Sequence, residues 1–504
     1  MRKMVLFAVT AIFMVGIVYC NLNDNPASTE ADPAFFTVTF NTNGGSAVEP
    51  QQIAEGGTVN EPEPVPEKEH HAFAGWYKDN ETFKDRWNFD ENTVAGDITL
   101  FAKWVEYFTS IADAAAYLAA HQGGLSVNAP IFLPMDIDLG YMNGFGYANS
   151  DNGWTQLLQV IANADKYVSL DLSLCSLSSP IVFPNLALSA GARRVASLVL
   201  PLAATIISGS QTETIMWQNF AFRHFTVLHE VTGLNITSIG HGAFLRRTTL
   251  KKVNFPAVET IEGSAFNSTV IETANFPEAS AIGQGAFGGT PLKSISFPST
   301  VTIDGSVFAN TPSLTSFILT DSGGDLSVIE GGKVLVRNGT ELVAYPSASG
   351  SIAMDGITAI GTGAFSSNSI LEGVSFPAVT TIGWEAFEGC TALESAYFPL
   401  IASIGDSAFA RTGNKPLTIT MGTYAPTMRP FIFTGVASEK TIIVRVPQGS
   451  VGYVLDGTTI PAFFSGADAT VSWGNGFRGR GWNGTGFTGS SVNRNIALSI
   501  VYMD

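Results

Sequence analysis

The sequence predicts a mostly β chain in which short parallel strands stack into a solenoid. The main observation is a six-residue pattern, Ile-Gly-x-x-Ala-Phe, that returns at a step of roughly 21–22 residues. A Phe-Pro pair returns at the same step. A unit this short cannot bury its apolar side chains alone, so successive units must share one continuous core. Only 14% of the residues are charged, and Gly, Ser, Thr and Phe are abundant, as in turn-rich β proteins.

The copies of the six-residue pattern begin at Ile239, Ile261, Ile282, Ile303, Ile360, Ile382 and Ile404. The Phe-Pro pairs begin at Phe255, Phe276, Phe297, Phe376 and Phe398. In one unit, Leu250, Val253 and Phe255 alternate as in a strand with one buried face. Pro256 ends that strand because it has no N–H to donate. Since a Phe closes every copy, the rings are expected to stack in a column along the solenoid axis.

The Ile-Gly-x-x-Ala-Phe and Phe-Pro signatures resemble the BspA-type leucine-rich repeat. The sequence departs from the standard leucine-rich repeat because no recurring Asn follows the strand, and a Phe column takes the place of the Asn ladder. The resemblance implies a leucine-rich-repeat solenoid. It also implies a place among bacterial surface proteins, which include adhesins that bind host matrix proteins such as fibronectin and fibrinogen.

Residues 1–20 are expected to be an export or lipoprotein signal, with Arg2 and Lys3 before an apolar run. The sequence Ile-Val-Tyr-Cys that ends at Cys20 resembles a bacterial lipobox, which implies cleavage before Cys20 and lipid on its thiol. Ordinary secretion and a retained anchor are the alternatives. Residues 21–34 are polar and are expected to be a tether. Each alternative places the mature chain outside the cytoplasm, at the cell surface or outer membrane if it is lipid-anchored.

Residues 35–105 are expected to form a separate small domain. Strands are predicted at residues 36–40, 75–77 and 100–104, with a Gly-rich turn after the first strand. The Pro- and Glu-rich residues 61–69 are expected to be an extended loop. The motifs Val38-Thr39-Phe40-x-x-x-Gly44-Gly45, Phe73-Ala74-Gly75-Trp76-Tyr77 and Leu100-Phe101-Ala102-Lys103-Trp104 resemble the internalin-B-type B-repeat. That resemblance implies a β-grasp-like module, which in bacterial surface proteins serves as a spacer and sometimes as a binding unit.

Residues 106–166 are expected to form an α/β cap at the N-terminal end of the solenoid, because a solenoid needs its open end covered. Helices are predicted at residues 110–122 and 153–164, the first with a capping box of Ser110 and Asp113. Strands are predicted at residues 131–133 and 137–139.

The solenoid itself is expected over residues 167–435, with a hairpin insertion near residues 320–356. Asn338-Gly339 between two apolar runs is a strong hairpin signal, and the hairpin is expected to project from the solenoid. Residues 436–504 are expected to be a C-terminal cap, with strands at 441–446 and 495–502. The Gly- and Trp-rich residues 473–482 either belong to that cap or bind carbohydrate.

Charge and motif content exclude several classes of function. The net charge is −17 and the pI is about 4.8, which argues against nucleic acid or an anionic membrane surface as a partner. Cys20, Cys175 and Cys390 form no CxxC or disulfide framework, and no His lies in an HExxH or HxH pattern. No GxSxG, P-loop or dinucleotide fingerprint is present. The chain is therefore expected to be no enzyme and to need no cofactor or metal.

The function predicted from these observations is a cell-surface protein-binding scaffold, an adhesin for host matrix proteins. The candidate binding residues stand between the core positions of the repeated strands. They are Lys252, Asn254, Thr273, Asn275, Ser294, Ser296, Ser316, Ile318, Ser375, Ser395 and Tyr397. Most are small and polar, whereas energetically dominant contacts usually involve aromatic or Arg side chains. A structural spacer without a specific ligand, and carbohydrate binding through residues 473–482, are the alternative functions.

Overall fold

The computed structural model describes residues 34–140, 152–177, 190–208, 221–413, 415–428, 432–433, 441–450, 486–487 and 496–503. The predicted signal with Cys20, the tether up to residue 33, and residues 473–482 lie outside this description. The chain divides into two compact units. Of the described residues, the first unit contains 34–69 and 73–104, and the second contains 70–72 and those from 105 onward.

The first unit is a four-stranded sheet in the order β2-β1-β4-β3. Its strands are β1 (Phe35–Asn41), β2 (Gln51–Ala54), β3 (His71–Tyr77) and β4 (Ile98–Glu106). The three predicted strands lie within β1, β3 and β4. Val38, Trp76 and Leu100 are buried in its core, and the Phe40 and Trp76 rings meet edge to face at 4.9 Å.

The second unit begins with α1 (Ile111–Ala120), β5 (Ile131–Pro134), α2 (Gly153–Ala164) and β6 (Val168–Asp171). The Ser110 side chain accepts a hydrogen bond from the Asp113 amide at 3.1 Å, which caps α1 as predicted. The apolar face of α2 is fully buried and shares one core with the repeated strands that follow. The predicted strand at residues 137–139 is wrong. Asp138 makes only an isolated bridge to Ser176, because its carboxylate accepts from the Gly140 amide and turns the chain.

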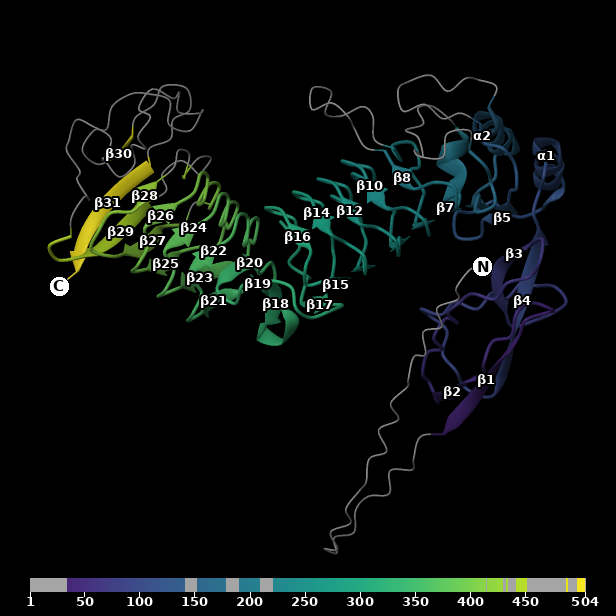
Figure 1. Cartoon of the computed structure of the whole chain (residues 1–504), viewed down its shortest axis with the longest axis horizontal. Coiled ribbons are helices and arrows are strands. Elements are labelled where there is room, and N and C mark those ends of the chain that lie inside the picture. Colours follow the sequence, from purple (N-terminus) through teal and green to yellow (C-terminus); the bar gives the residue numbers. More distant parts are fainter. Residues whose placement is uncertain are drawn as a thin grey trace, which may run out of the picture. The chain divides into compact units, whose positions relative to one another are not determined.

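After β6, most coils of the chain contribute two short strands, and consecutive coils lie side by side (Figure 1). The first strands of the coils are β7 (Val195–Val199), β9 (Glu230–Thr232), β11 (Lys252–Asn254), β13 (Thr273–Asn275), β15 (Ser294–Phe297), β17 (Ser316–Leu319), β21 (Gly350–Ala353), β23 (Leu371–Ser375), β25 (Ser395–Phe398), β27 (Leu417–Met421), β29 (Thr441–Pro447) and β31 (Ile496–Met503), with β30 (Gly486–Phe487) beside the last. The second strands are β8 (Ile206–Ile207), β10 (Ser238–Ile239), β12 (Thr260–Ile261), β14 (Ala281–Ile282), β16 (Thr302–Ile303), β22 (Ala359–Ile360), β24 (Thr381–Ile382), β26 (Ser403–Ile404) and β28 (Thr427–Met428). A short helical turn, η1 (Gly191–Arg194), precedes β7. Neighbouring coils pair in parallel, so the predicted solenoid of short parallel strands is confirmed.

The predicted column of Phe rings is present and forms the axis of the core. Phe222, Phe244, Phe266 and Phe287 stack with nearly parallel rings at centroid distances of 4.5, 5.2 and 5.4 Å. A second column starts at Phe365 and continues through Phe387 and Phe409 at 5.1 Å for each step. All of these rings are fully buried. The column therefore joins each coil to the next through apolar contact.

Hydrogen bonds at the turns reinforce this contact. The amide of Phe266 donates to the Ala286 carbonyl of the next coil at 2.8 Å, in the same way that Phe244 donates to Ala265. Three residues after four of the rings, a buried Thr hydroxyl donates back to the Phe carbonyl, as Thr290 does to Phe287 at 2.8 Å. Thr269, Thr311 and Thr412 repeat this bond in their coils. These hydroxyls satisfy carbonyls that water cannot reach.

The insertion forms β18 (Leu326–Ile329), a turn η2 (Glu330–Gly332), β19 (Val334–Arg337) and β20 (Glu341–Ala344). The strands β19 and β20 pair antiparallel around Asn338 and Gly339, which both have positive φ as a tight hairpin turn requires. The expectation that this hairpin projects from the solenoid is wrong. Leu335 packs into the core of the preceding coils, whereas Val334 and Val336 pack into the core of the following coils. A strand with consecutive apolar residues buries both of its faces.

Replacing one ring of the column should destabilise the second unit. Phe266→Ala leaves a cavity between the Phe244 and Phe287 rings, and a buried Phe-to-Ala change costs about 3–5 kcal/mol. Urea unfolding followed by circular dichroism measures the loss. Leu400→Ala is the matched control, because Leu400 is 60% exposed and its truncation should change the free energy of unfolding by less than about 0.5 kcal/mol. Equal effects of the two changes would contradict a packed Phe column.

The two described cysteines should be chemically inert in the folded protein. Cys175 and Cys390 are buried free thiols, and their loss of solvent raises the pKa of each to about 12. Iodoacetamide at pH 8 should leave both unlabelled until denaturant is added, as read by peptide mass spectrometry. Rapid labelling of Cys390 without denaturant would show that its coil opens.

Candidate protein-binding faces

The predicted binding residues lie on the first strands of the coils, and the structure divides them among three sheets. The strands β11, β9, β7, β6 and β5 form one sheet, and the strands β13, β15 and β17 form a second. The third sheet has the order β21-β23-β25-β27-β29-β31-β30. Lys252 and Asn254 stand on the edge strand of the first sheet, where they pair with Glu230 and Thr232. The predicted face is therefore interrupted, and its second and third parts are separate sheets that precede and follow the insertion in the chain.

The middle sheet brings six of the predicted residues together in two rows. One row is Thr273, Ser294 and Ser316. The other is Asn275, Ser296 and Ile318, in which the Ser296 hydroxyl donates to the Asn275 amide oxygen at 2.5 Å. Ile318 is 49% exposed at the end of its row. This sheet offers short hydroxyl and amide groups, with Ile318 as its large apolar side chain.

The third sheet contains the remaining predicted residues and a shallow hollow of about 680 Å³. Ser375, Tyr397, Thr420 and Arg445 follow one another in register across β23, β25, β27 and β29. In the neighbouring row, a Cβ on Gly373 would lie only 2.5 Å from the Ser395 hydroxyl. Because Gly373 has no side chain, the hollow stays open beside Ser395.

Charged groups of both signs line this hollow. Glu372 and Glu394 stand at the beginnings of their strands, and Arg445 stands near the end of β29. The Glu394 carboxylate also pairs with Lys415 in the next coil, and this raises the pKa of the Lys415 ammonium. Tyr397 is 41% exposed beside these charges. The hollow thus combines an aromatic ring and a guanidinium, the side chains most enriched at the centres of protein interfaces.

Arg445 was missed by the sequence analysis, although its strand was predicted. The alternation of residues 441–446 places Arg445 on the outward face with Ile443. Its approach to Tyr397 depends on the coil register, because the two residues are separated by a complete coil of irregular length.

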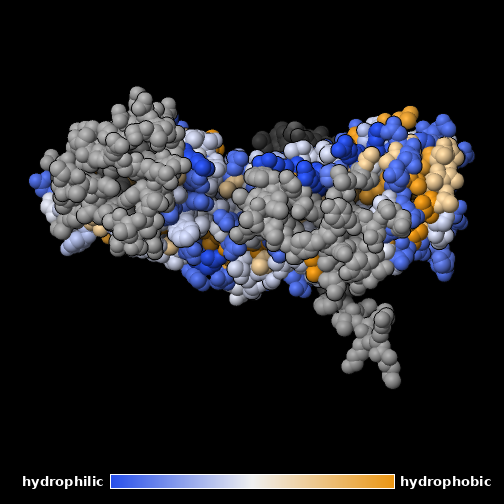
Figure 2. All heavy atoms as spheres, turned by 90° about the horizontal axis from the view of Figure 1, so that it is seen from above, coloured by the Kyte–Doolittle hydropathy of each residue, from blue (hydrophilic) through white to orange (hydrophobic). Residues whose placement is uncertain are grey.

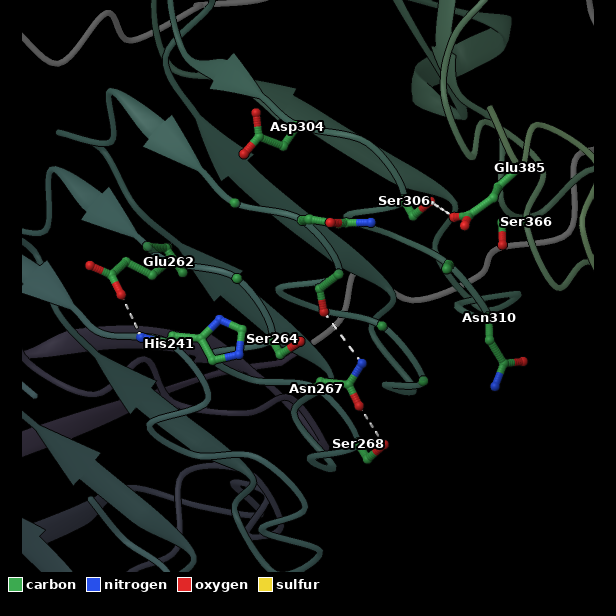
Figure 3. Close-up of a pocket in the computed structure, with 18 of the residues that line it drawn as sticks. His241, Glu262, Ser264, Asn267, Ser268, Asp304, Ser306, Asn310, Ser366 and Glu385 are labelled. Carbon is green, nitrogen blue, oxygen red and sulfur yellow. Dashed lines mark hydrogen bonds between the residues drawn. The ribbon is translucent and has the colours of Figure 1, made fainter. Parts of the chain in front are cut away.

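A second hollow, of about 820 Å³, lies on the turn side of the coils (Figure 3). His241 and Glu262 line one part, where the Glu262 carboxylate accepts from the His241 amide at 2.7 Å. Ser306 and Glu385 line another part and are joined by a 3.4 Å hydrogen bond. Further lining is mostly Gly, Ser and Asn. This hollow is acidic and presents no Phe, Tyr or Trp side chain among its described lining residues.

The turn-side hollow exists because the coils join directly across the insertion. The Ser306 amide donates to the Thr362 carbonyl at 3.3 Å, and the Asn310 amide donates to the Ser366 carbonyl at 3.1 Å. The turn side therefore continues from one array to the other, while the inserted strands β18, β19 and β20 extend the sheet of second strands that continues with β22. Figure 2 shows a face on which polar residues predominate among the described residues.

Among the described residues, no group of three or more His, Cys, Asp or Glu side chains is placed to hold a metal ion. Within the same residues, no helix has both the length and the apolar character to span a bilayer.

Comparison with known proteins identifies two regions of the chain. Residues 36–103 match the Listeria-Bacteroides repeat domain, and residues 216–328 and 349–442 match the BspA type leucine rich repeat region. Two curated relatives from Evansella cellulosilytica, named as a Gly-rich membrane protein and a membrane protein, are 49% and 46% identical over 69 residues, which is 14% of this chain. The match spans only 8% and 10% of the lengths of those relatives.

Solved structures with leucine-rich repeats are also similar to this chain. A leucine-rich repeat protein from Eubacterium ventriosum is 20% identical, with a TM-score of 0.44, and the match covers 54% of this chain and 74% of that protein. A leucine rich cell surface protein from Faecalibacterium prausnitzii is 23% identical, with a TM-score of 0.36 and coverage of 51% and 74%. The chain thus carries a Listeria-Bacteroides repeat domain followed in sequence by a BspA-type leucine-rich repeat region, in agreement with both resemblances seen in the sequence.

Proposed function

We propose that this protein is a bacterial cell-surface scaffold that binds an extended segment of a partner protein across its third sheet. The observation that carries the proposal is the hollow in which Tyr397 and Arg445 stand above a floor of small side chains. The BspA-type repeat region supports a surface role and a protein partner, because stacked repeats present long surfaces suited to extended ligands.

The geometry of the hollow suits a peptide-like ligand. Tyr397 and Arg445 stand on β25 and β29 of one sheet, with β27 between them, so the backbone that holds them needs no rearrangement to contact a bound segment. Glu372 and Glu394 can accept hydrogen bonds from cationic or amide groups at the strand beginnings, whereas Arg445 can donate to a carboxylate or carbonyl. A partner segment that carries both signs of charge therefore complements this hollow.

We further propose that the partner is a host extracellular-matrix protein of the fibronectin or fibrinogen kind. The resemblance to adhesins with this repeat type motivates the choice, and a protein partner agrees with a net charge of −17, which disfavours polyanions. If the protein is instead a spacer without a ligand, neither fibronectin nor fibrinogen should bind it saturably in the experiment below.

Replacing Tyr397 or Arg445 should weaken binding of the partner protein. Immobilised fibronectin and fibrinogen should bind the full chain saturably in biolayer interferometry. Tyr397→Ala and Arg445→Glu should each raise the Kd at least tenfold, a change of about 1.4 kcal/mol or more, because each removes a central contact. Tyr424→Ala is the matched control, since Tyr424 is 73% exposed and lies outside the residues that line the hollow.

Other variants and outcomes separate the alternatives. Lys252→Glu reports whether the ligand extends to the first sheet, because Lys252 lies on its edge strand. Saturable binding with a Kd that neither Tyr397→Ala nor Arg445→Glu changes would show that the third sheet is not the binding surface. Absence of binding to every matrix and plasma protein tested would favour a spacer.

Surface display by a lipid anchor is a separate part of the proposal. Protease treatment of intact cells should release peptides from residues 250–420, and Cys20→Ser should move the protein from the membrane fraction to the medium. Mass spectrometry of the released peptides and fractionation blots measure the two effects. Unchanged membrane retention of the Cys20→Ser variant would rule out lipid on Cys20.

A further inference from the structure

The hollow on the turn side of the coils has a floor that glycine residues keep open. One coil supplies four lining glycines, and they are Gly283, Gly285, Gly288 and Gly289. The coils before and after it carry side chains at most of these positions, such as Ser264 and Ser306 on either side of Gly285. A Cβ built on Gly285 would have only the Ser264 hydroxyl within 4 Å, at 3.8 Å. A side chain at this position would therefore enter the hollow.

Carboxylates surround this floor at positions where the repeat ordinarily has a small residue (Figure 3). Glu262 and Asp304 stand at the second position of the six-residue pattern, where the other five copies have Gly. Glu385 stands at the fourth position, where every other copy has Gly or Ser. Glu388 also lines the hollow, whereas no Lys or Arg is among its described lining residues. The negative charge is thus specific to the turns around the hollow and is not a property of every coil.

The contacts of these carboxylates within the chain are mostly with neutral groups. Glu262 accepts from the His241 amide at 2.7 Å, and Glu385 accepts from the Ser306 hydroxyl at 3.4 Å. Glu388 pairs with Arg411 at 2.9 Å. Among the described residues, no Lys or Arg forms an ion pair with Glu262, Asp304 or Glu385. The hollow can therefore accept cationic groups from another molecule without breaking an ion pair at these three residues.

Trp384 adds an exposed aromatic side chain to the same turns. It is 61% exposed and directly precedes Glu385 in the chain. It stands at the third position of the pattern, and Gly263 and Gln284 at that position line the hollow in their coils. Among the aromatic side chains, Trp binds a Lys or Arg cation over its face most strongly. A basic side chain that approaches Glu385 can therefore also contact an indole ring.

We propose that the turn-side hollow and Trp384 form a second docking site, which binds an extended basic segment of a partner protein. Successive Phe rings from Phe266 to Phe308 are 5.4 and 6.1 Å apart, whereas an extended chain rises about 3.3 Å per residue. An extended segment of several residues can thus pass over several coils and offer Lys or Arg side chains to Asp304 and Glu385. The glycine floor allows the backbone of the segment to approach closely.

The docking site is independent of the function proposed for the third sheet. The turn-side hollow shares no lining residue with the hollow that contains Tyr397 and Arg445. Its carboxylates repel polyanions, and its lining lacks the aromatic side chains on which sugars or nucleic-acid bases stack. A basic protein segment is the ligand that complements both its charge and its shape.

The test uses a defined probe, the fluorescent peptide Gly-Arg-Gly-Lys-Gly-Arg-Gly-Lys-Gly, and the full chain. Fluorescence anisotropy should show saturable binding that weakens as NaCl rises from about 50 to about 300 mM, because the contact is ionic. Asp304→Asn together with Glu385→Gln should raise the Kd about tenfold or more, since both anionic partners are lost. Trp384→Ala should raise it about threefold or more, because the cation–π contact is removed.

Gly285→Gln tests the shape of the hollow without changing its charge. Glu385 carries a long side chain at the same turn position with a φ of 53°, close to the 64° of Gly285, so the turn can accept this change. The added side chain should fill part of the hollow and raise the Kd about fivefold or more. Asp304→Gly restores the Gly of the pattern and serves as a second charge variant. Thermal melting monitors the folding of each variant.

The matched control removes two carboxylates elsewhere in the same unit. Glu278→Gln together with Asp355→Asn changes exposed residues outside both hollows and should bind the probe as the wild type does. Tyr397→Ala should also leave probe binding unchanged, so failure of this proposal is distinguishable from failure of the third-sheet function. Absence of probe binding, or an equal loss in the control pair and in the Asp304 and Glu385 pair, overturns the proposal. Spermidine that displaces the probe as effectively as unlabelled peptide overturns the assignment to a protein segment.

Discussion

The second unit depends on one constraint: no coil of about 21–22 residues can bury its own apolar side chains. Each coil meets this constraint by sharing a Phe ring with the coil before and the coil after, at centroid distances such as 5.2 Å between Phe244 and Phe266. The amides of these Phe residues donate to the next coil, so contact and hydrogen bonding act at the same place. The strands can then remain short, and their outward residues are left available for binding.

The insertion follows from the same constraint. The coil that ends the first array and the coil that begins the second must both cover their apolar faces, and β19 does this for both through Leu335 on one side and Val334 on the other. On the turn side, Ser306 and Thr362 join the arrays directly. The result is an interrupted strand face with a hollow in its last part, and a continuous turn side with charged clusters of its own.

Much of this arrangement could be predicted from the sequence, because a pattern that repeats in register specifies which residues share a column. The Phe rings, the cap helices and the hairpin turn at Asn338-Gly339 were all predicted from local signals. The features that the sequence did not predict depend on contacts between coils of irregular length. Arg445 reaches the row of Tyr397 only through the register of β27, and the burial of Val334 depends on two cores meeting at one strand.

The most direct measurement of the stacked coils is amide hydrogen exchange of the folded chain, followed by mass spectrometry. The amides of Phe244 and Phe266 donate across coils on the turn side, far from any long strand. If the shared rings hold the coils together, peptides that contain these amides should exchange as slowly as peptides from the strands β15 and β25, and all should open together. Exchange of the Phe peptides at the rate of exposed loops, with protection confined to the strands, would contradict the account.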